Sequence, residues 1–136
     1  FDMPYYDLIS GNDLSVYPSY YEPWGYTPLE SVAFKVPAIT TDLAGFGLWV
    51  NAELRREGEI EDGVKVIRRT DYNHDEVAEA IRDTVAHYAA MDDKAVAAAR
   101  DKAGRLSKKA LWKHFIKHYE QAYDVALRKA EERKHS

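Results

Sequence analysis

Residues 17–37, YPSYYEPWGYTPLESVAFKVP, decide how this chain folds. A run with strand character ends at Pro18, and the aromatic turn that follows is broken by Pro23 and Gly25. A helix is expected to begin at Thr27. A strand, a turn and a helix in this order direct unpaired backbone N–H groups and the positive end of the helix dipole toward one point. The sequence therefore predicts an anion-binding site at the start of this helix.

Two carboxylates flank the turn, because Glu22 and Glu30 stand eight positions apart. Thr27, Pro28 and Glu30 also have the spacing of a capping box, in which Glu30 would only accept a hydrogen bond at the helix start. Glu22 could equally be a solvated acid in a loop, the usual state of an isolated glutamate. From the residues alone, a functional and a purely structural interpretation stay open for both acids.

Strands and helices alternate along the chain. Short runs rich in β-branched residues predict strands at 13–18, 38–41 and 63–67. Apolar residues spaced three and four apart, with glycine or proline near the ends, predict helices at 4–11, 28–35, 46–57, 75–91, 94–104 and 107–134. This order predicts an α/β fold, with a parallel sheet covered by helices on both faces and a long C-terminal helix.

Three strands form only about half of the sheet in a complete nucleotide-binding domain of the Rossmann type. We therefore interpret residues 1–91 as the second half of a Rossmann-like domain and residues 92–136 as a C-terminal helical extension. The apolar stripe of the helix at 107–134 is expected to pack back across the domain, and it would also allow several copies of the chain to assemble. Because the chain begins at Phe1, we expect a fragment of a longer protein.

Composition excludes several classes of protein. The 136 residues are 46% hydrophobic and 31% charged, which is typical of a soluble globular domain, and no run is long enough to span a membrane. The net charge of −4 argues against a nucleic-acid partner. Cysteine is absent, which excludes disulfides and cysteine zinc sites and fits a cytoplasmic protein.

Two runs carry a more specific signal. PSYYEPWGYTPLES at 18–31 and VPAITTDLAGFG at 36–47 resemble the signature of glycogen synthases of the fungal and animal type. Members of that family have two glutamates in the form E-PWGYTPxE, and Glu22 and Glu30 match this spacing. The resemblance is dense over 17–47 and looser over most of the remaining chain. It implies part of the C-terminal lobe of a retaining glucosyltransferase with two Rossmann-like domains, the GT-B architecture. In intact enzymes of this architecture the last helix often crosses to the partner domain, so the resemblance also allows part of the stripe at 107–134 to be left exposed.

The resemblance also implies roles for single residues. Glu22 would be the catalytic carboxylate, held close to the donor sugar, where positive charge develops near the anomeric carbon. Glu30 would hold the ribose of the donor nucleotide. Tyr5 matches the position of an aromatic ring that stacks on uracil, and the neighbouring Tyr6 is the alternative one position along.

Donor binding would further involve the four residues of the turn, Trp24, Gly25, Tyr26 and Thr27, which we call the anion cradle. Backbone N–H groups of Gly25 to Thr27 and the helix dipole can neutralise part of the charge on a departing nucleoside diphosphate. Gly25 would let the backbone approach the ligand closely. Ordinary core packing is the alternative for the side chains of Trp24 and Tyr26.

The implied reaction is transfer of glucose from UDP-glucose to glycogen or another α-1,4-glucan with retention, without a cofactor or a metal. The missing N-terminal domain of the same protein would complete the site, so the fragment alone should be inactive. Where eukaryotic members carry an arginine-rich helix that binds glucose 6-phosphate, residues 88–108 keep Arg100, Lys102 and Arg105 but are otherwise rich in alanine. We therefore expect a bacterial-like member without control by glucose 6-phosphate. Alternatives are a starch-type GT-B enzyme that uses ADP-glucose, and a non-catalytic module that binds a nucleotide or a partner.

Overall fold

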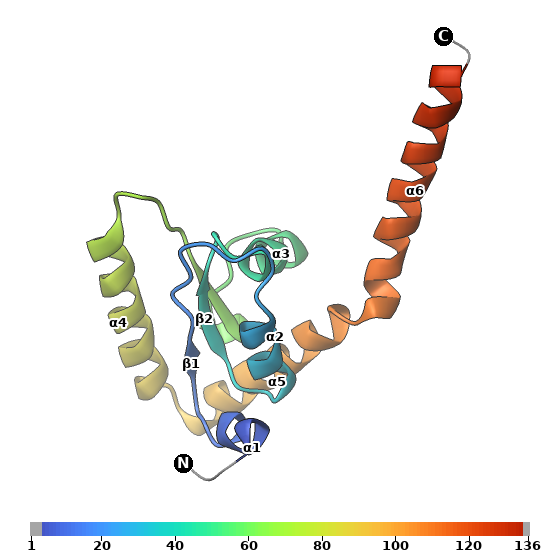
Figure 1. The fold of residues 1–136 in the computed structure, drawn as a ribbon. Coiled ribbons are helices and arrows are strands. Elements are labelled where there is room, and N and C mark those ends of the chain that lie inside the picture. The colour runs from blue at the N-terminus through green and yellow to red at the C-terminus, as the bar shows by residue number, and fades with distance from the viewer. Residues whose placement is uncertain (1–3, 135–136) are drawn as a thin grey trace.

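The computed structural model describes residues 4–134 and confirms the α/β architecture (Figure 1). One parallel sheet has the strand order β1-β2-β3, formed by β1 (Ser15–Val16), β2 (Ala38–Thr41) and β3 (Val64–Ile67). The helices are α1 (Tyr5–Ser10), α2 (Tyr26–Ala33), α3 (Gly45–Leu54), α4 (His74–Ala90), α5 (Asp93–Lys109) and α6 (Trp112–Lys134), with a 3-10 turn η1 (Ile60–Asp62) before β3. In register, Ala38 pairs with both Ser15 and Val64.

The core has two halves because side chains alternate across the sheet. One half joins the sheet to α2, α3 and α5, and its buried residues are Val32, Ala38, Phe46, Val50, Val64, Val66, Ala103 and Leu106. The other half joins the sheet to α4, and its buried residues are Ile39, Ile60, Ile67, Val77 and Tyr88. Helices therefore cover both faces of the sheet, as the sequence predicts, with α4 on the side opposite α2 and α3 (Figure 1).

The first strand and the third helix are shorter than predicted. Backbone pairing of the first strand continues only to Tyr17, whose N–H donates to the Ile39 carbonyl at 2.8 Å, because the next residue, Pro18, has no N–H to donate. The helix predicted at 46–57 ends at Leu54, since Arg55 takes a left-handed conformation with φ of 56°.

The predicted helix end at Gly104 is wrong. Gly104 lies inside α5, where a Cβ would come within 3.1 Å of the Lys35 side chain, so the glycine serves the packing of α5 near the end of α2. A second close approach occurs at Gly63, where φ is 89° and a Cβ would lie 2.4 Å from the Ala103 nitrogen. Helix α5 thus packs tightly into the body of the fold, and the helical path breaks only at 110–111.

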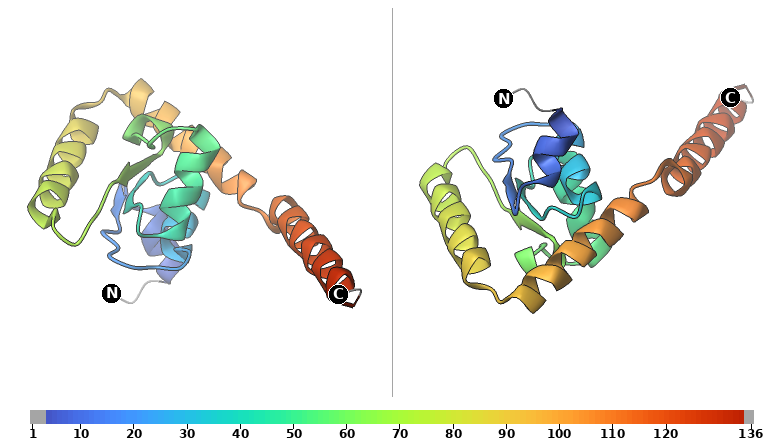
Figure 2. Two further views of the ribbon diagram at one scale, coloured as in Figure 1. Left: turned by 90° about the horizontal axis from the view of Figure 1, so that it is seen from above. Right: turned by 90° about the horizontal axis from the view of Figure 1, so that it is seen from below.

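The C-terminal helix α6 extends away from the body of the molecule (Figures 1 and 2). It has no buried residue, and only Phe115 and Ile116 are half-buried. The prediction that its stripe packs back across the domain is therefore wrong, whereas the prediction of a long C-terminal helix is confirmed. None of the helices within residues 4–134 combines the length and the apolar character needed to cross a membrane.

Candidate functional site

The predicted site lies at the carboxyl edge of the sheet, where the loops after β1 (residues 17–25), β2 (residues 42–44) and β3 (residues 68–73) meet. Open parallel sheets bind ligands at this edge because the strand ends leave a crevice between the loops. The loop after β1 crosses to the start of α3: Gly45 N–H donates to the Glu22 carbonyl at 3.1 Å, and Phe46 N–H donates to the Trp24 carbonyl at 2.6 Å. The backbone around Glu22 is thus fixed by a folded neighbour.

Gly45 makes this crossing possible. A Cβ at this position would lie 2.2 Å from the Pro23 carbonyl oxygen, so no other residue allows the two backbones to come this close. Its neighbour Ala44 forms a parallel bridge with Glu22. The AGFG sequence that follows β2 is therefore the support on which the turn at 22–25 rests.

The Glu22 side chain is half-buried and turned toward the start of α2. Its Oε2 accepts a hydrogen bond from Ser19 Oγ at 3.0 Å and would lie 3.5 Å from a Cβ built on Gly25. Glu22 is therefore not a freely solvated loop acid. The sequence analysis did not identify Ser19 as a partner of Glu22. The spacing was a usable signal, because in a tight turn a serine hydroxyl can reach the carboxylate of a glutamate three residues later.

Helix α2 begins two residues earlier than predicted, and the capping box, which was the structural alternative for Glu30, does not form. Gly25 is the N-cap, with φ of 109°, and no side chain of the described residues caps the helix. The backbone N–H groups of Gly25, Tyr26 and Thr27 have no acceptor within residues 4–134. This start of α2 thus presents three unpaired donors beside Glu22, which is the geometry of an anion site.

The side chains of the anion cradle have different surroundings. Trp24 packs in an aromatic cluster, with ring centroids 6.1 Å from Phe46 and 5.5 Å from Phe115, as in the core-packing alternative. Tyr26 is 71% exposed and lines an open groove of about 400 Å³ between α2 and the start of α6. Thr27 is half-buried in the first turn of α2.

The other two predicted donor residues, Tyr5 and Glu30, lie next to each other. The pKa of the Tyr5 hydroxyl is raised above its ordinary value by partial burial and by the neighbouring Glu30 carboxylate. Tyr6 instead contacts the Phe34 ring, with centroids 5.6 Å apart. Glu30 is half-buried on α2, and neither it nor Glu22 forms an ion pair with any residue the structure describes. Both acids therefore keep an uncompensated charge.

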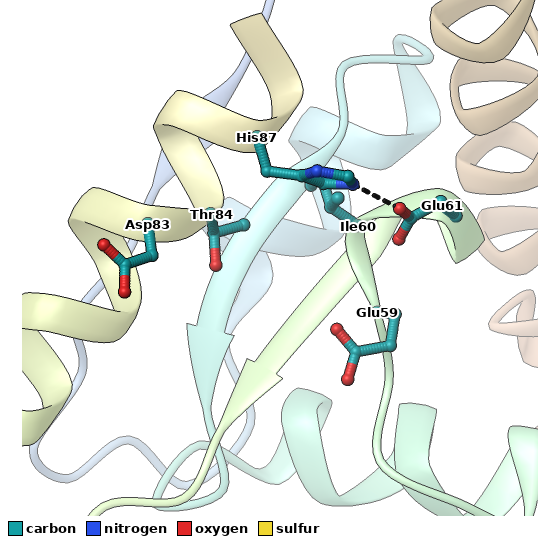
Figure 3. Close-up of a pocket in the computed structure, with 6 residues that line it drawn as sticks. All are labelled: Glu59, Ile60, Glu61, Asp83, Thr84 and His87. Carbon is teal, nitrogen blue, oxygen red and sulfur yellow. Dashed lines mark hydrogen bonds and ion pairs between the residues drawn. The ribbon is translucent and has the colours of Figure 1, made fainter. Parts of the chain in front are cut away.

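A separate pocket of about 270 Å³ lies at the amino end of β3, between η1 and α4 (Figure 3). The ring of His87 extends from α4 toward Glu61, and its Nε2 lies 2.5 Å from Glu61 Oε1 (Figure 3). This contact lowers the pKa of the Glu61 carboxyl. None of the predicted site residues lines this pocket, and the part of the chain from 4 to 134 contains no group of three or more acidic, histidine or cysteine side chains suited to a metal ion.

The comparisons with known proteins all point to the same family. A sequence model of the family described as "Glycogen synthase" matches residues 1–136. Over 128 residues, the chain is 32% identical to "Glycogen [starch] synthase isoform 1" of Saccharomyces cerevisiae and 32% identical to "Glycogen [starch] synthase" of Neurospora crassa. It is 29% identical over 128 residues to "Glycogen [starch] synthase, liver" of Mus musculus. Each alignment covers 94% of this chain and 18% of the relative, so the chain spans about 18% of the length of these relatives.

Proposed function

Because this chain belongs to the glycogen synthase family, we propose that it forms the donor side of a glucosyltransferase that elongates glycogen or another α-1,4-glucan. The proposed donor is UDP-glucose, and the proposed stereochemical course is retention. Residues 1–91 would be the second half of the nucleotide-sugar-binding domain in a GT-B enzyme, and 92–136 its C-terminal helical extension. One observation carries the proposal: the unpaired N–H groups at 25–27 lie directly beside an acid that has no ion-pair partner within residues 4–134.

The anion cradle and Glu22 would have different roles in the proposed reaction. When the bond between glucose and the diphosphate breaks, negative charge grows on the phosphate oxygens and positive charge grows near the anomeric carbon. The N–H groups of the anion cradle and the dipole of α2 would stabilise the phosphate oxygens. The Glu22 carboxylate, turned toward the same helix start, would stabilise or orient the sugar.

The nucleoside would extend from the cradle along α2 toward α1. Glu30, on the same helix as the cradle, would bind the ribose hydroxyls, and Tyr5 beside it would stack on the base. A carboxylate without an ion-pair partner suits this role, since it can accept hydrogen bonds from two neighbouring hydroxyls.

The partners that complete the site would be the glucan acceptor and the upstream N-terminal domain. The proposed location is the cytoplasm. We also propose that several copies of the protein can associate. Domain closure would exclude water from the reaction, so residues 1–136 alone should not transfer glucose. Activation by glucose 6-phosphate is not expected. Of the basic residues Arg100, Lys102 and Arg105 on α5, Arg100 lies beside Tyr88 and Lys102 lies 4.0 Å from Asp62, so both already have partners in the fold.

A donor assay on the full-length protein tests the proposal. We expect glucan elongation with UDP-glucose, and little or none with ADP-glucose. Glu22→Ala should lower kcat by a factor of about 10² or more, because it removes charge stabilisation in the transition state, and should leave the melting temperature unchanged. Preference for ADP-glucose would indicate the starch-type enzyme, and nucleotide binding without turnover would indicate a binding module. A Glu22→Ala variant with the wild-type rate would remove the role of Glu22.

A further inference from the structure

The loop after β3 holds the loop after β1 through two residues that the sequence did not single out. Arg69 Nη1 donates to the Pro18 carbonyl at 2.6 Å, and its guanidinium carbon lies 5.3 Å from the centre of the Tyr20 ring. The Tyr20 hydroxyl donates to Asp71 Oδ1. We call these four residues, Arg69 and Asp71 with Pro18 and Tyr20, the edge clamp.

Arg69 is itself anchored to the sheet. Its backbone N–H donates to Asp42 Oδ1 at 2.8 Å, so the loops after all three strands meet at this residue. Tyr20 is 55% exposed and belongs to neither half of the core. Because apolar burial contributes little at Tyr20, the first part of the loop, residues 18–20, is held by the polar and cation–π contacts of the edge clamp together with the bond from Thr41 Oγ1 to the Ser19 carbonyl. The start of α3 holds the part that follows, from Glu22 to Trp24.

The residue enclosed by the edge clamp is Ser19, and it connects the clamp to Glu22. The Ser19 hydroxyl donates to Glu22 Oε2 at 3.0 Å, and the Ser19 carbonyl accepts from Thr41 Oγ1 at 2.6 Å. A shift of Pro18 or Tyr20 would therefore move the one side chain that donates a hydrogen bond to the Glu22 carboxylate within the described residues.

We propose that Arg69 and Asp71 are positioning residues, which hold the loop after β1 so that the Glu22 carboxylate faces the donor sugar. This inference rests on the proposed function, because it gives the edge clamp a role in glucosyl transfer. A carboxylate that stabilises charge in a transition state must be held within a fraction of an ångström, and small misplacements cost much of its effect.

The test uses the full-length protein with Arg69→Ala, and with Arg68→Ala as the matched control, since the Arg68 side chain is exposed and has no partner in the described part of the chain. We expect Arg69→Ala to lower kcat by about tenfold to a hundredfold. The KM for UDP-glucose should stay within about twofold, because the donor is bound elsewhere, by the anion cradle and Glu30. Arg69→Lys should recover part of the rate, since an ammonium can still donate to the Pro18 carbonyl and lie over the Tyr20 ring. Arg68→Ala should behave like the wild type.

A double-mutant cycle separates positioning from a general loss of structure. If Arg69 acts through Glu22, Arg69→Ala should cause no further loss of kcat in a Glu22→Gln background. Tyr20→Phe is a milder change, because it removes only the hydrogen bond to Asp71. If the Arg69→Ala variant does not fold, Tyr20→Phe still tests whether the edge clamp positions Glu22. It should lower kcat several-fold, and again only when Glu22 is present.

The possible failures are distinguishable. Absence of glucan elongation from UDP-glucose by the wild-type protein would overturn the proposed function. A Glu22→Gln variant with the wild-type rate would overturn the role of Glu22 and, with it, the positioning role. A slow Glu22→Gln variant combined with a normal rate for Arg69→Ala and Tyr20→Phe would overturn the positioning role alone. Equal losses from Arg69→Ala with and without Glu22, accompanied by a lower melting temperature, would assign Arg69 a purely structural role.

Discussion

Glu22 and Glu30 have only neutral side-chain partners within residues 4–134. The Glu22 carboxylate accepts a hydrogen bond from the Ser19 hydroxyl, and Glu30 lies beside the Tyr5 hydroxyl. Neutral donors orient a carboxylate without cancelling its charge. The two acids can therefore act on a ligand, and their removal should affect ligand binding or turnover more than folding.

Glu30→Ala is predicted to weaken donor binding and to leave stability nearly unchanged. Loss of one or two hydrogen bonds between a charged group and the ribose hydroxyls should raise the Kd for UDP-glucose about tenfold or more. The unfolding free energy should change by no more than about 0.5 kcal/mol, the usual range for a surface substitution. Calorimetric titration and thermal unfolding measure the two effects, with the exposed Glu79→Ala as control. Unchanged affinity with a clear drop in melting temperature would make Glu30 a structural residue.

Thr40→Val is predicted to stabilise the protein. Thr40 is fully buried in β2, and its Oγ1 has no hydrogen-bond partner among residues 4–134, so its hydroxyl loses water without compensation. Replacement by the isosteric valine should raise the unfolding free energy by about 1 kcal/mol. The matched control is Thr41→Val, because the Thr41 hydroxyl donates to Ser19 and accepts from Leu43. Urea unfolding should show opposite signs for the two variants, and a loss of stability in Thr40→Val would contradict the prediction.

At the scale of elements, the sequence predicted the order of strands and helices correctly, and its errors have physical causes. The pattern T-P-x-E suggested a helix start at Thr27, but Gly25 already turns the chain, with φ of 109°, so α2 begins at Tyr26. Gly104 resembled a helix end, but glycine also permits close packing within a helix. How far α6 contacts the body of the fold could not be predicted, since an apolar stripe on a helix does not show which surface it packs against.

The sequence also marked one part of the candidate site and missed another part. The motif marked Glu22, Glu30 and the anion cradle, because these residues stand close together in the sequence. Arg69 and Asp71 were missed because they reach the loop after β1 from 51 residues away, and only the parallel pairing of β1, β2 and β3 brings the loops together. Contacts of this kind depend on the register of the sheet, and a local pattern does not contain them.

Asp62 joins three elements, and its removal is predicted to reduce stability in a pH-dependent way. It accepts two hydrogen bonds from Arg56 after α3, at 2.7 and 2.8 Å, and lies 4.0 Å from Lys102 of α5. The bonds from Arg56 hold its pKa below the ordinary value. A lowered pKa in the folded state means that the stabilisation is present above the unfolded pKa of about 4 and is lost as the pH falls through the folded pKa.

Asp62→Asn should therefore lower the unfolding free energy at pH 7 by roughly 1–2 kcal/mol, and the difference from the wild type should shrink below about pH 4. Urea unfolding between pH 7 and pH 3 measures this. Asp101→Asn is the control, because Asp101 pairs with Lys35 on the exposed surface, where an ion pair contributes little. A difference that stays constant with pH would show that the Asp62 carboxylate acts by packing rather than by charge.

The whole molecule consists of a three-layered body, with the sheet between two layers of helices, and a projecting arm. Helices α2 to α5 enclose the sheet, whereas α6 continues outward from the end of α5 (Figures 1 and 2). Its main contact with the body is Phe115, whose ring lies 5.5 Å from Trp24 and 6.0 Å from Trp49. A helix with no buried residue gains little from the body that it leaves.

A chain truncated after Ala110 is therefore predicted to keep its fold, with an unfolding free energy about 1–2 kcal/mol below that of residues 1–136. Most of this loss should come from one ring, because Phe115 is the larger of the two half-buried side chains of α6 and lies against Trp24 and Trp49. Phe115→Ala in the chain of 136 residues should consequently reproduce the loss, as measured by urea unfolding of both proteins. An unfolded truncated chain would mean that α6 belongs to the folding unit. A much smaller loss in Phe115→Ala than in the truncated chain would instead place the stabilising contact at Ile116 or farther along α6, where residues 117–134 have only exposed side chains.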